Sequence, residues 1–168
     1  GGSVIVVADT DGTRLTATPS VPGLAVALDA GEFVQVETTR SFVLDSTHPV
    51  LVGRAVVGQA AVGVTEGIGD PSLGIVGPVG AYGREAWVDV PAGFEQAWLS
   101  AVAPDGALVT VDGAPAPGTT VDIGAWTTHH VALSPGLHQI EASEPIGASV
   151  IGYDGFTSFE HIAPGTYR

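Results

Sequence analysis

Residues 26–37, with the sequence VALDAGEFVQVE, decide the fold class of this chain. A short apolar run ends in a turn at Gly31, and from residue 33 to residue 37 valine then occupies every second position. Alternation with a period of two is typical of a β-strand that has one buried face. The turn between the two runs needs a residue that tolerates positive φ, which Gly31 provides. The stretch therefore predicts two strands joined by a tight turn.

The same texture of short apolar runs and turn residues extends over the whole chain. The 168 residues include 24 Gly and 12 Pro, a density of helix breakers that excludes long helices. Hydrophobic residues make up 45% and charged residues 14%, which excludes an intrinsically disordered protein. We therefore expect an all-β, β-sandwich-like fold, with no helix longer than about two turns.

Several landmarks occur twice in the same order. Residues 131–141, VALSPGLHQIE, match the opening stretch, so that Gly136 corresponds to Gly31. Asp11-Gly12 corresponds to Asp105-Gly106, and both pairs are typical of hairpin turns. Downstream, His48-Pro49-Val50 corresponds to Glu144-Pro145-Ile146. These matches predict two duplicated antiparallel strand units.

The predicted organisation is a single domain over residues 4–168. Its repeats lie at about 4–58 and 97–153, and a Gly-rich segment, 58–96, joins them. Because each unit alone is small, we expect their two sheets to share one core. Residues 1–3, Gly-Gly-Ser, are interpreted as a cloning remnant.

Residue types that are missing from the sequence exclude several functions. The chain has no Cys, Met, Lys or Asn. Disulfides, zinc–thiolate sites, cysteine nucleophiles and Schiff-base chemistry are therefore excluded, and the lack of Met suggests a piece of a longer chain. A net charge of −13 disfavours nucleic acid and anionic membranes as partners.

No sequence motif indicates catalysis, a cofactor or a metal. Asp9-Thr10-Asp11-Gly12 begins like a calcium loop but has Ser20 at the twelfth position, so we interpret it as a plain turn. His129 and His130 are neighbours in a predicted strand and would point to opposite faces. A G-x-S-x-G elbow is absent. The prediction is a non-enzymatic protein without cofactors, and a serine hydrolase remains a remote alternative.

The best candidates for partner contacts are Tyr82, Arg84 and Trp126. Trp87 and Trp98 lie in predicted strands, where tryptophan is most often buried, whereas Trp126 follows a loop-like stretch and is expected to be the most exposed of the three tryptophans. Arg84 is expected to pair with Asp70 or with another carboxylate of segment 58–96.

A set of strings resembles the IgGFc-binding domain family. The most specific are Gly69-Asp70-Pro71-Ser72-Leu73 and Leu133-Ser134-Pro135-Gly136-Leu137-His138, supported by Leu28–Phe33, His48–Gly53 and Pro78–Tyr82. The resemblance implies a non-enzymatic, all-β binding or adhesion module, corresponding to the C-terminal portion of the family's fuller domain. It also implies an extracellular or cell-surface location.

The richness in Ala, Val, Gly and Asp fits a bacterial multidomain protein. The expected partners are a protein or neutral glycan surface and neighbouring domains of the same chain, because the acidic charge favours neutral or basic targets. A structural spacer without a ligand is the alternative.

Some mucin-type domains cleave themselves at a Gly-Asp-Pro-His string. Ser72 replaces the histidine here, so no imidazole is available at that bond to move protons. The sequence predicts an intact chain, with Asp70 and Pro71 in a turn.

Overall fold

The computed structural model describes residues 2–56, 71–94, 96–116, 119–155 and 157–163. Within these residues almost all regular structure is β, and the only helical element is a 3-10 turn, η1 (Val79–Ala81). The all-β, sandwich-like prediction is thereby confirmed. None of the described segments forms a helix of the length and apolarity that a bilayer span requires.

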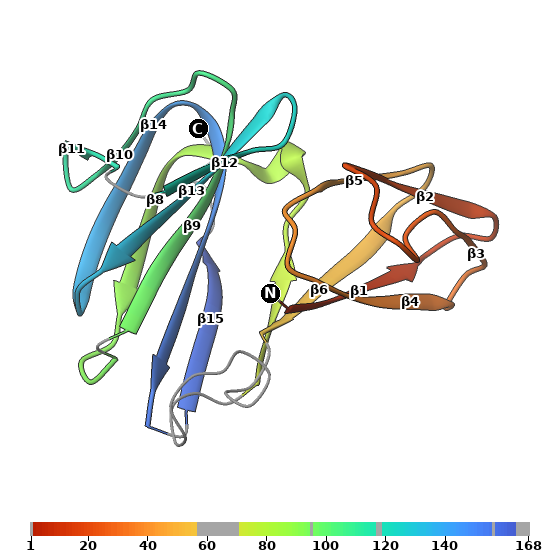
Figure 1. The fold of residues 1–168 in the computed structure, drawn as a ribbon, viewed down its shortest axis with the longest axis horizontal. Coiled ribbons are helices and arrows are strands. Elements are labelled where there is room, and N and C mark those ends of the chain that lie inside the picture. Colours follow the sequence, from red (N-terminus) through yellow and green to blue (C-terminus); the bar gives the residue numbers. More distant parts are fainter. Residues whose placement is uncertain (1, 57–70, 95, 117–118, 156, 164–168) are drawn as a thin grey trace.

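The strands gather into two lobes (Figure 1). In the N-terminal lobe, a four-stranded sheet of order β4-β1-β6-β7 lies against a smaller sheet of order β3-β2-β5. Alternate side chains of β1, among them Val4, Val6 and Ala8, face the space between these sheets and are buried. The bounds are β1 (Gly2–Ala8), β2 (Thr13–Thr18), β3 (Ala27–Leu28), β4 (Phe33–Thr38), β5 (Val43–Ser46), β6 (Val50–Val56) and β7 (Ser72–Val76).

The C-terminal lobe is organised around one 19-residue strand, β14 (Gly136–Asp154). Its first part pairs with β8 and β10, its register shifts between Glu141 and Ile146, and its second part pairs with β9 and β15. One strand therefore contributes to both layers of the lobe. The other bounds are β8 (Gly83–Val90), β9 (Gln96–Pro104), β10 (Val109–Val111), β11 (Ala114–Pro115), β12 (Thr119–Asp122), β13 (Trp126–Leu133) and β15 (Thr157–Ala163).

The buried hydrophobic residues form two clusters, one in each lobe. Val6, Leu15 and Leu24 belong to the first, and Leu99 and Ile140 belong to the second. The expectation of one core shared by both units is therefore wrong. Each unit folds back on itself, so that the apolar sides of its alternating strands face each other within the same lobe.

Parts of the two units have matching strand registers. Val7 pairs with Leu51, and the residues aligned with them, Val102 and Gly147, also pair with each other. The turns match less well. Gly31 links β3, which pairs with β2, to β4, whereas Gly136 links β13, which pairs with β9, to β14. The expected equivalence of Gly31 and Gly136 is thus wrong, because pairing between distant strands and not local turn chemistry places each turn. Duplication itself stays a prediction.

One further expectation about connections needs correction. The turns at Gly12 and Gly106 are not hairpins, since neither β1 and β2 nor β9 and β10 pair with each other. The described part of the Gly-rich segment 58–96 contains β7, η1 and β8. Gly2 and Ser3 lie within β1, opposite Thr38 and Glu37, and their interpretation as a cloning remnant stays a prediction.

The turn glycines have the positive φ that their turns require. The values are +68° at Gly12, +81° at Gly31, +78° at Gly106 and +129° at Gly136. We predict that Gly31→Val lowers the free energy of unfolding by about 1–3 kcal/mol, because a β-branched residue is strained at this backbone conformation. Urea unfolding of the purified chain measures the change.

Gly77→Val is the matched control for this prediction. An added Cβ would meet no atom within 4 Å at either Gly31 or Gly77, but only Gly31 has positive φ. An equal loss of stability in both variants would contradict the strain argument.

Candidate functional site

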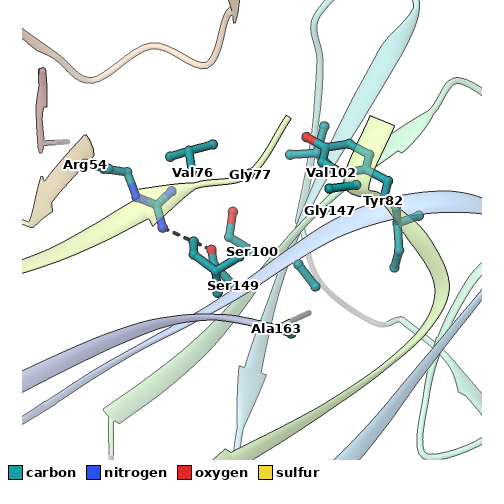
Figure 2. A pocket seen from close by; sticks show the side chains of 13 residues that line it. Arg54, Val76, Gly77, Tyr82, Ser100, Val102, Gly147, Ser149 and Ala163 are labelled. Atoms are coloured by element: carbon teal, nitrogen blue, oxygen red, sulfur yellow. Dashed lines mark hydrogen bonds between the residues drawn. The ribbon is translucent and has the colours of Figure 1, made fainter. Parts of the chain in front are cut away.

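A cavity of about 210 Å³ lies where the two lobes meet (Figure 2). Its wall on the N-terminal side comes from β6 and β7, and its floor comes from β9, β14 and β15. The lining is mostly apolar, with a guanidinium and three hydroxyl groups, those of Tyr82, Ser100 and Ser149, as its polar features. The lining residues are Arg54, Val76, Gly77, Ala81, Tyr82, Ser100, Val102, Ile146, Gly147, Ala148, Ser149, Ile162 and Ala163.

Arg54 joins the lobes through an ion pair that is partly buried. Its Nε donates to Oε1 of Glu160 over 2.8 Å, its Nη2 also donates to that oxygen, and Nη2 reaches Oγ of Ser149 at 3.0 Å. The Glu160 side chain has no exposed surface, and its Oε2 has no hydrogen-bond partner among the described residues. Gly74 makes room for it, because a Cβ there would lie 2.8 Å from Cδ of Glu160.

Tyr82 and Trp126 meet at the edge of the cavity. Their rings contact edge to face, with centroids 6.0 Å apart and an interplanar angle of 88°. The Tyr82 ring also packs on Gly147, where a Cβ would lie 2.5 Å from the ring. Burial raises the pKa of the Tyr82 hydroxyl above its usual value. Two of the three contact residues chosen from the sequence are thus brought together, although both are half-buried.

Arg84 lies two residues beyond Tyr82 and pairs with a carboxylate of another strand. Its Nη2 donates to Oε2 of Glu144 over 2.9 Å, and both side chains are largely exposed. Glu144 is 60 positions away in sequence, but β8 and β14 are neighbours in the fold. The expected pairing with Asp70 stays a prediction. Asp70 itself lies outside the described residues, and Pro71 is exposed directly before β7.

The prediction that Trp126 is the most exposed tryptophan is wrong. Trp87 is 47% exposed and Trp98 is 39% exposed, while Trp126 is half-buried against Tyr82. The signal that was missed is the strand period, since Trp87 alternates with the buried residues Ala86 and Val88. A tryptophan at an outward position of such a strand faces solvent.

The outer side of the β4-β1-β6-β7 sheet carries a mainly apolar surface, here called the apolar face. Val7 lies opposite Phe33 and Leu51, and Ile5 and Ile75 both lie opposite Gly53. Directly opposed residues share one side of a sheet, and the polar side chains of Ser3 and Gln35 lie on this side as well. Phe33 is 64%, Leu73 61%, Leu51 53% and Ile75 48% exposed. The apolar face consists of Ile5, Val7, Phe33, Leu51, Leu73 and Ile75, and Glu37 is the only charged residue among the described residues paired on this side.

The Asp9–Gly12 segment forms a turn that is locked to a second turn. The Gly12 amide donates to Oδ1 of Asp29 over 3.0 Å, and the Ala30 amide donates to Oδ1 of Asp11 over 2.9 Å. Both aspartates are thereby engaged as acceptors for backbone amides. Among the described residues, no cluster of three metal-ligating side chains occurs.

His138 has a defined environment that the sequence did not reveal. Its Nδ1 lies 2.7 Å from Oδ2 of Asp112, and its Nε2 lies 2.8 Å from the carbonyl oxygen of Ser134. Both neighbours can only accept hydrogen bonds, so the doubly protonated ring fits best. Burial lowers the pKa of His138, but these two hydrogen bonds outweigh burial and the pKa is raised. With both nitrogens occupied, this ring cannot serve as the base of a serine hydrolase.

The pKa values of His129 and His130 are shifted in the opposite direction from that of His138. His129 and His130 are partly buried in β13, and burial is the main cause that lowers the pKa of both. They are therefore neutral near pH 7.

The ion pair leads to a stability prediction. Glu160→Gln should lower the free energy of unfolding by about 1–3 kcal/mol, because Arg54, whose side chain is 29% exposed, would remain at the lobe junction without its carboxylate partner. Glu144→Gln is the matched control, since it breaks an exposed ion pair and should cost about 0–1 kcal/mol. Similar losses in the two variants, measured by urea unfolding, would contradict the assigned role of Arg54 and Glu160.

A pH-dependent prediction follows from His138. Asp112→Asn should cost more stability at about pH 5 than at about pH 8.5. A raised pKa adds stability that is fully present below the pKa of the unfolded histidine and is lost as the pH rises through the folded pKa. Denaturant unfolding at both pH values measures the difference, and Asp45→Asn is the control. Equal losses at both pH values would be inconsistent with a protonated His138.

Comparison with known proteins identifies the family of this chain. No curated protein and no solved structure matches it. A family model described as IgGFc binding protein matches residues 2–152, which include both lobes from β1 into the second part of β14. The match spans most of the sequence and agrees with the resemblance noted in its turn strings. The chain belongs to the IgGFc-binding protein family.

Proposed function

We propose that this chain is a non-enzymatic binding module of a secreted or surface-attached bacterial multidomain protein, and that its apolar face contacts a partner protein. The module would correspond to the C-terminal portion of the family's fuller domain. Membership of a family of binding domains supports the general function. The single observation that supports this surface is that four large hydrophobic residues are 48–64% exposed on one side of one sheet.

The apolar face favours binding over the alternative of a structural spacer. Exposed hydrophobic groups that lie next to each other are a liability, because they promote association with other apolar surfaces. A structural spacer does not need exposed hydrophobic side chains. They stand out in this chain, because its net charge is −13. Contiguous surfaces of this kind, with a polar rim, are typical of protein–protein contacts.

Charge defines the chemistry of the partner. Glu37, which is exposed, lies in β4 on the same side of the sheet as the apolar face. A partner with apolar side chains in the centre of its contact surface and neutral or basic groups at the rim would be steered toward this side. Binding by one module is expected to be weak, about micromolar, and tandem copies would gain through avidity.

Tyr82, Arg84 and Trp126 remain a second candidate contact region, with a neutral glycan as the alternative partner. They lie close together at one end of the C-terminal lobe, and Arg84 is exposed. Tyr82 and Trp126 mainly contact each other and Gly147, which favours a packing role for these two rings.

The apolar face can be tested with charge substitutions at exposed positions. The purified chain and a tandem copy would be screened by surface plasmon resonance against extracellular proteins, including antibody Fc, and against neutral glycans. We predict a protein ligand whose affinity falls at least tenfold in Leu51→Glu/Leu73→Glu, because two desolvated carboxylates would oppose the contact. The control is Leu108→Glu/Val121→Glu, which changes two apolar residues that are 73% and 43% exposed on the other lobe and that lie outside both surfaces.

Three outcomes would overturn the proposal. Equal loss in the control would place the contact elsewhere, and binding to glycans alone would favour the Tyr82 region. If neither the single nor the tandem chain binds any target at high concentration, the spacer interpretation should replace this one.

A further inference from the structure

A second surface, on the opposite lobe, has a different chemistry from the apolar face. On the outer side of β8, Glu85, Trp87 and Asp89 lie directly opposite Glu141, Gln139 and Leu137 of β14. The intervening residues of β8, Ala86 and Val88, are buried in the core of the lobe. These six outward residues are here called the Trp87 face.

A hydrogen bond from its ring N–H holds the indole of Trp87 in place. Its Nε1 donates to Oε1 of Glu85 over 3.0 Å, and the same oxygen accepts a hydrogen bond from Nε2 of Gln139 over 3.2 Å. Trp87 nevertheless remains 47% exposed, and Leu137 beside it is 64% exposed. Because the indole N–H of Trp87 already donates a hydrogen bond to Glu85, it is not available to a partner. A partner can therefore contact only the π surface of the ring.

The outward side chains of this surface carry negative charge. Glu85, Asp89 and Glu141 supply three carboxylates, and the six residues of the face include no cation. The protonated ring of His138 interacts with Asp89 but lies on the other side of β14, opposite the buried Val88. Arg84 is the next residue along β8, but its guanidinium is paired with Glu144. A fixed aromatic ring surrounded by carboxylates attracts a cation in two ways, through the ring quadrupole and through charge.

We propose that the Trp87 face is a docking surface for a partner protein that presents arginine or lysine side chains, with one cation placed over the indole of Trp87. Cation–π attraction orients the side chain, and Asp89 and Glu141 hold its charge. A neutral glycan could also stack on tryptophan. It fits less well, because the indole N–H that would bind a hydroxyl is engaged by Glu85 and because a neutral ligand gains no charge attraction from Asp89 and Glu141. This proposal does not depend on the apolar face being a binding surface.

The test uses a pair of probes that differ in charge alone. One is a 12-residue peptide that alternates arginine and glycine, and the other carries citrulline, the neutral isostere of arginine, at the same positions. Titration of the full chain by isothermal calorimetry at low salt should detect the arginine peptide and should find at least tenfold weaker binding of the citrulline peptide. Added salt should weaken binding further, because exposed charges are screened.

Variants assign the contact to this surface. Trp87→Leu should weaken binding of the arginine peptide at least fivefold, whereas Trp98→Leu, at a tryptophan that is 39% exposed on another face, should change it less than twofold. Asp89→Asn/Glu141→Gln keeps the ring and should also weaken binding at least fivefold. Its control, Asp9→Asn/Asp45→Asn, removes the same charge from exposed positions of the other lobe and should have less than a twofold effect. The two carboxylate variants keep the test valid if Trp87→Leu does not fold.

Several results would overturn the proposal. Equal affinity for the citrulline peptide would remove the role of charge, and equal effects of the two carboxylate variants would reduce binding to nonspecific attraction by an acidic chain. Trp87-dependent binding of a neutral hexasaccharide, without binding of the arginine peptide, would assign the face to a glycan instead. Failure of the arginine peptide to bind would leave the proposal on the apolar face untouched, since that surface lies on the other lobe.

Discussion

Strand β14 is the constraint on which the rest of the C-terminal lobe depends. Because its register shifts between Glu141 and Ile146, one continuous strand pairs with β8 and β10 and then with β9 and β15. The same strand supplies neighbours of the cavity and of the Trp87 face. Its first part carries residues that flank Trp87, and its second part offers Gly147 to the Tyr82 ring and Ser149 to Arg54. A change in the register of β14 would therefore alter both layers of the lobe and its contact with the N-terminal lobe at once.

The two lobes have separate hydrophobic cores and expose surfaces of different chemistry. Each lobe has its own hydrophobic cluster, and at their junction a partly buried ion pair joins Arg54 to Glu160. A pair of this kind specifies one arrangement more than it adds stability, because desolvation offsets much of the attraction between the charges. The outward faces then differ in character. The N-terminal sheet exposes hydrophobic side chains, and the sheet around Trp87 exposes an aromatic ring among carboxylates.

The sequence predicted features that depend on neighbouring residues, such as strands and turns. It did not predict which strands and side chains far apart in the sequence contact each other. Alternating valines and the breaker density gave the all-β class, and Gly31 adopts the positive φ that its turn needs. The shared core was wrong, because sequence texture does not say which strands pair. Trp126 was favoured over Trp87 because its segment looked like a loop, although the alternation around Trp87 already placed that residue outward. Arg54 and Glu160, which are 106 positions apart, carry no local signal of their contact.

The central claim is that the apolar face of the N-terminal sheet is uncovered and available to a partner. The most direct measurement is methyl nuclear magnetic resonance of the isolated chain with a soluble paramagnetic probe. The structure predicts strong relaxation of the methyl groups of Leu51, Leu73 and Ile75, which are about half exposed or more, and little effect on the buried Leu99 and Ile140. Protection of the Leu51, Leu73 and Ile75 methyls at all protein concentrations would mean that the chain covers this face itself, which would contradict the claim.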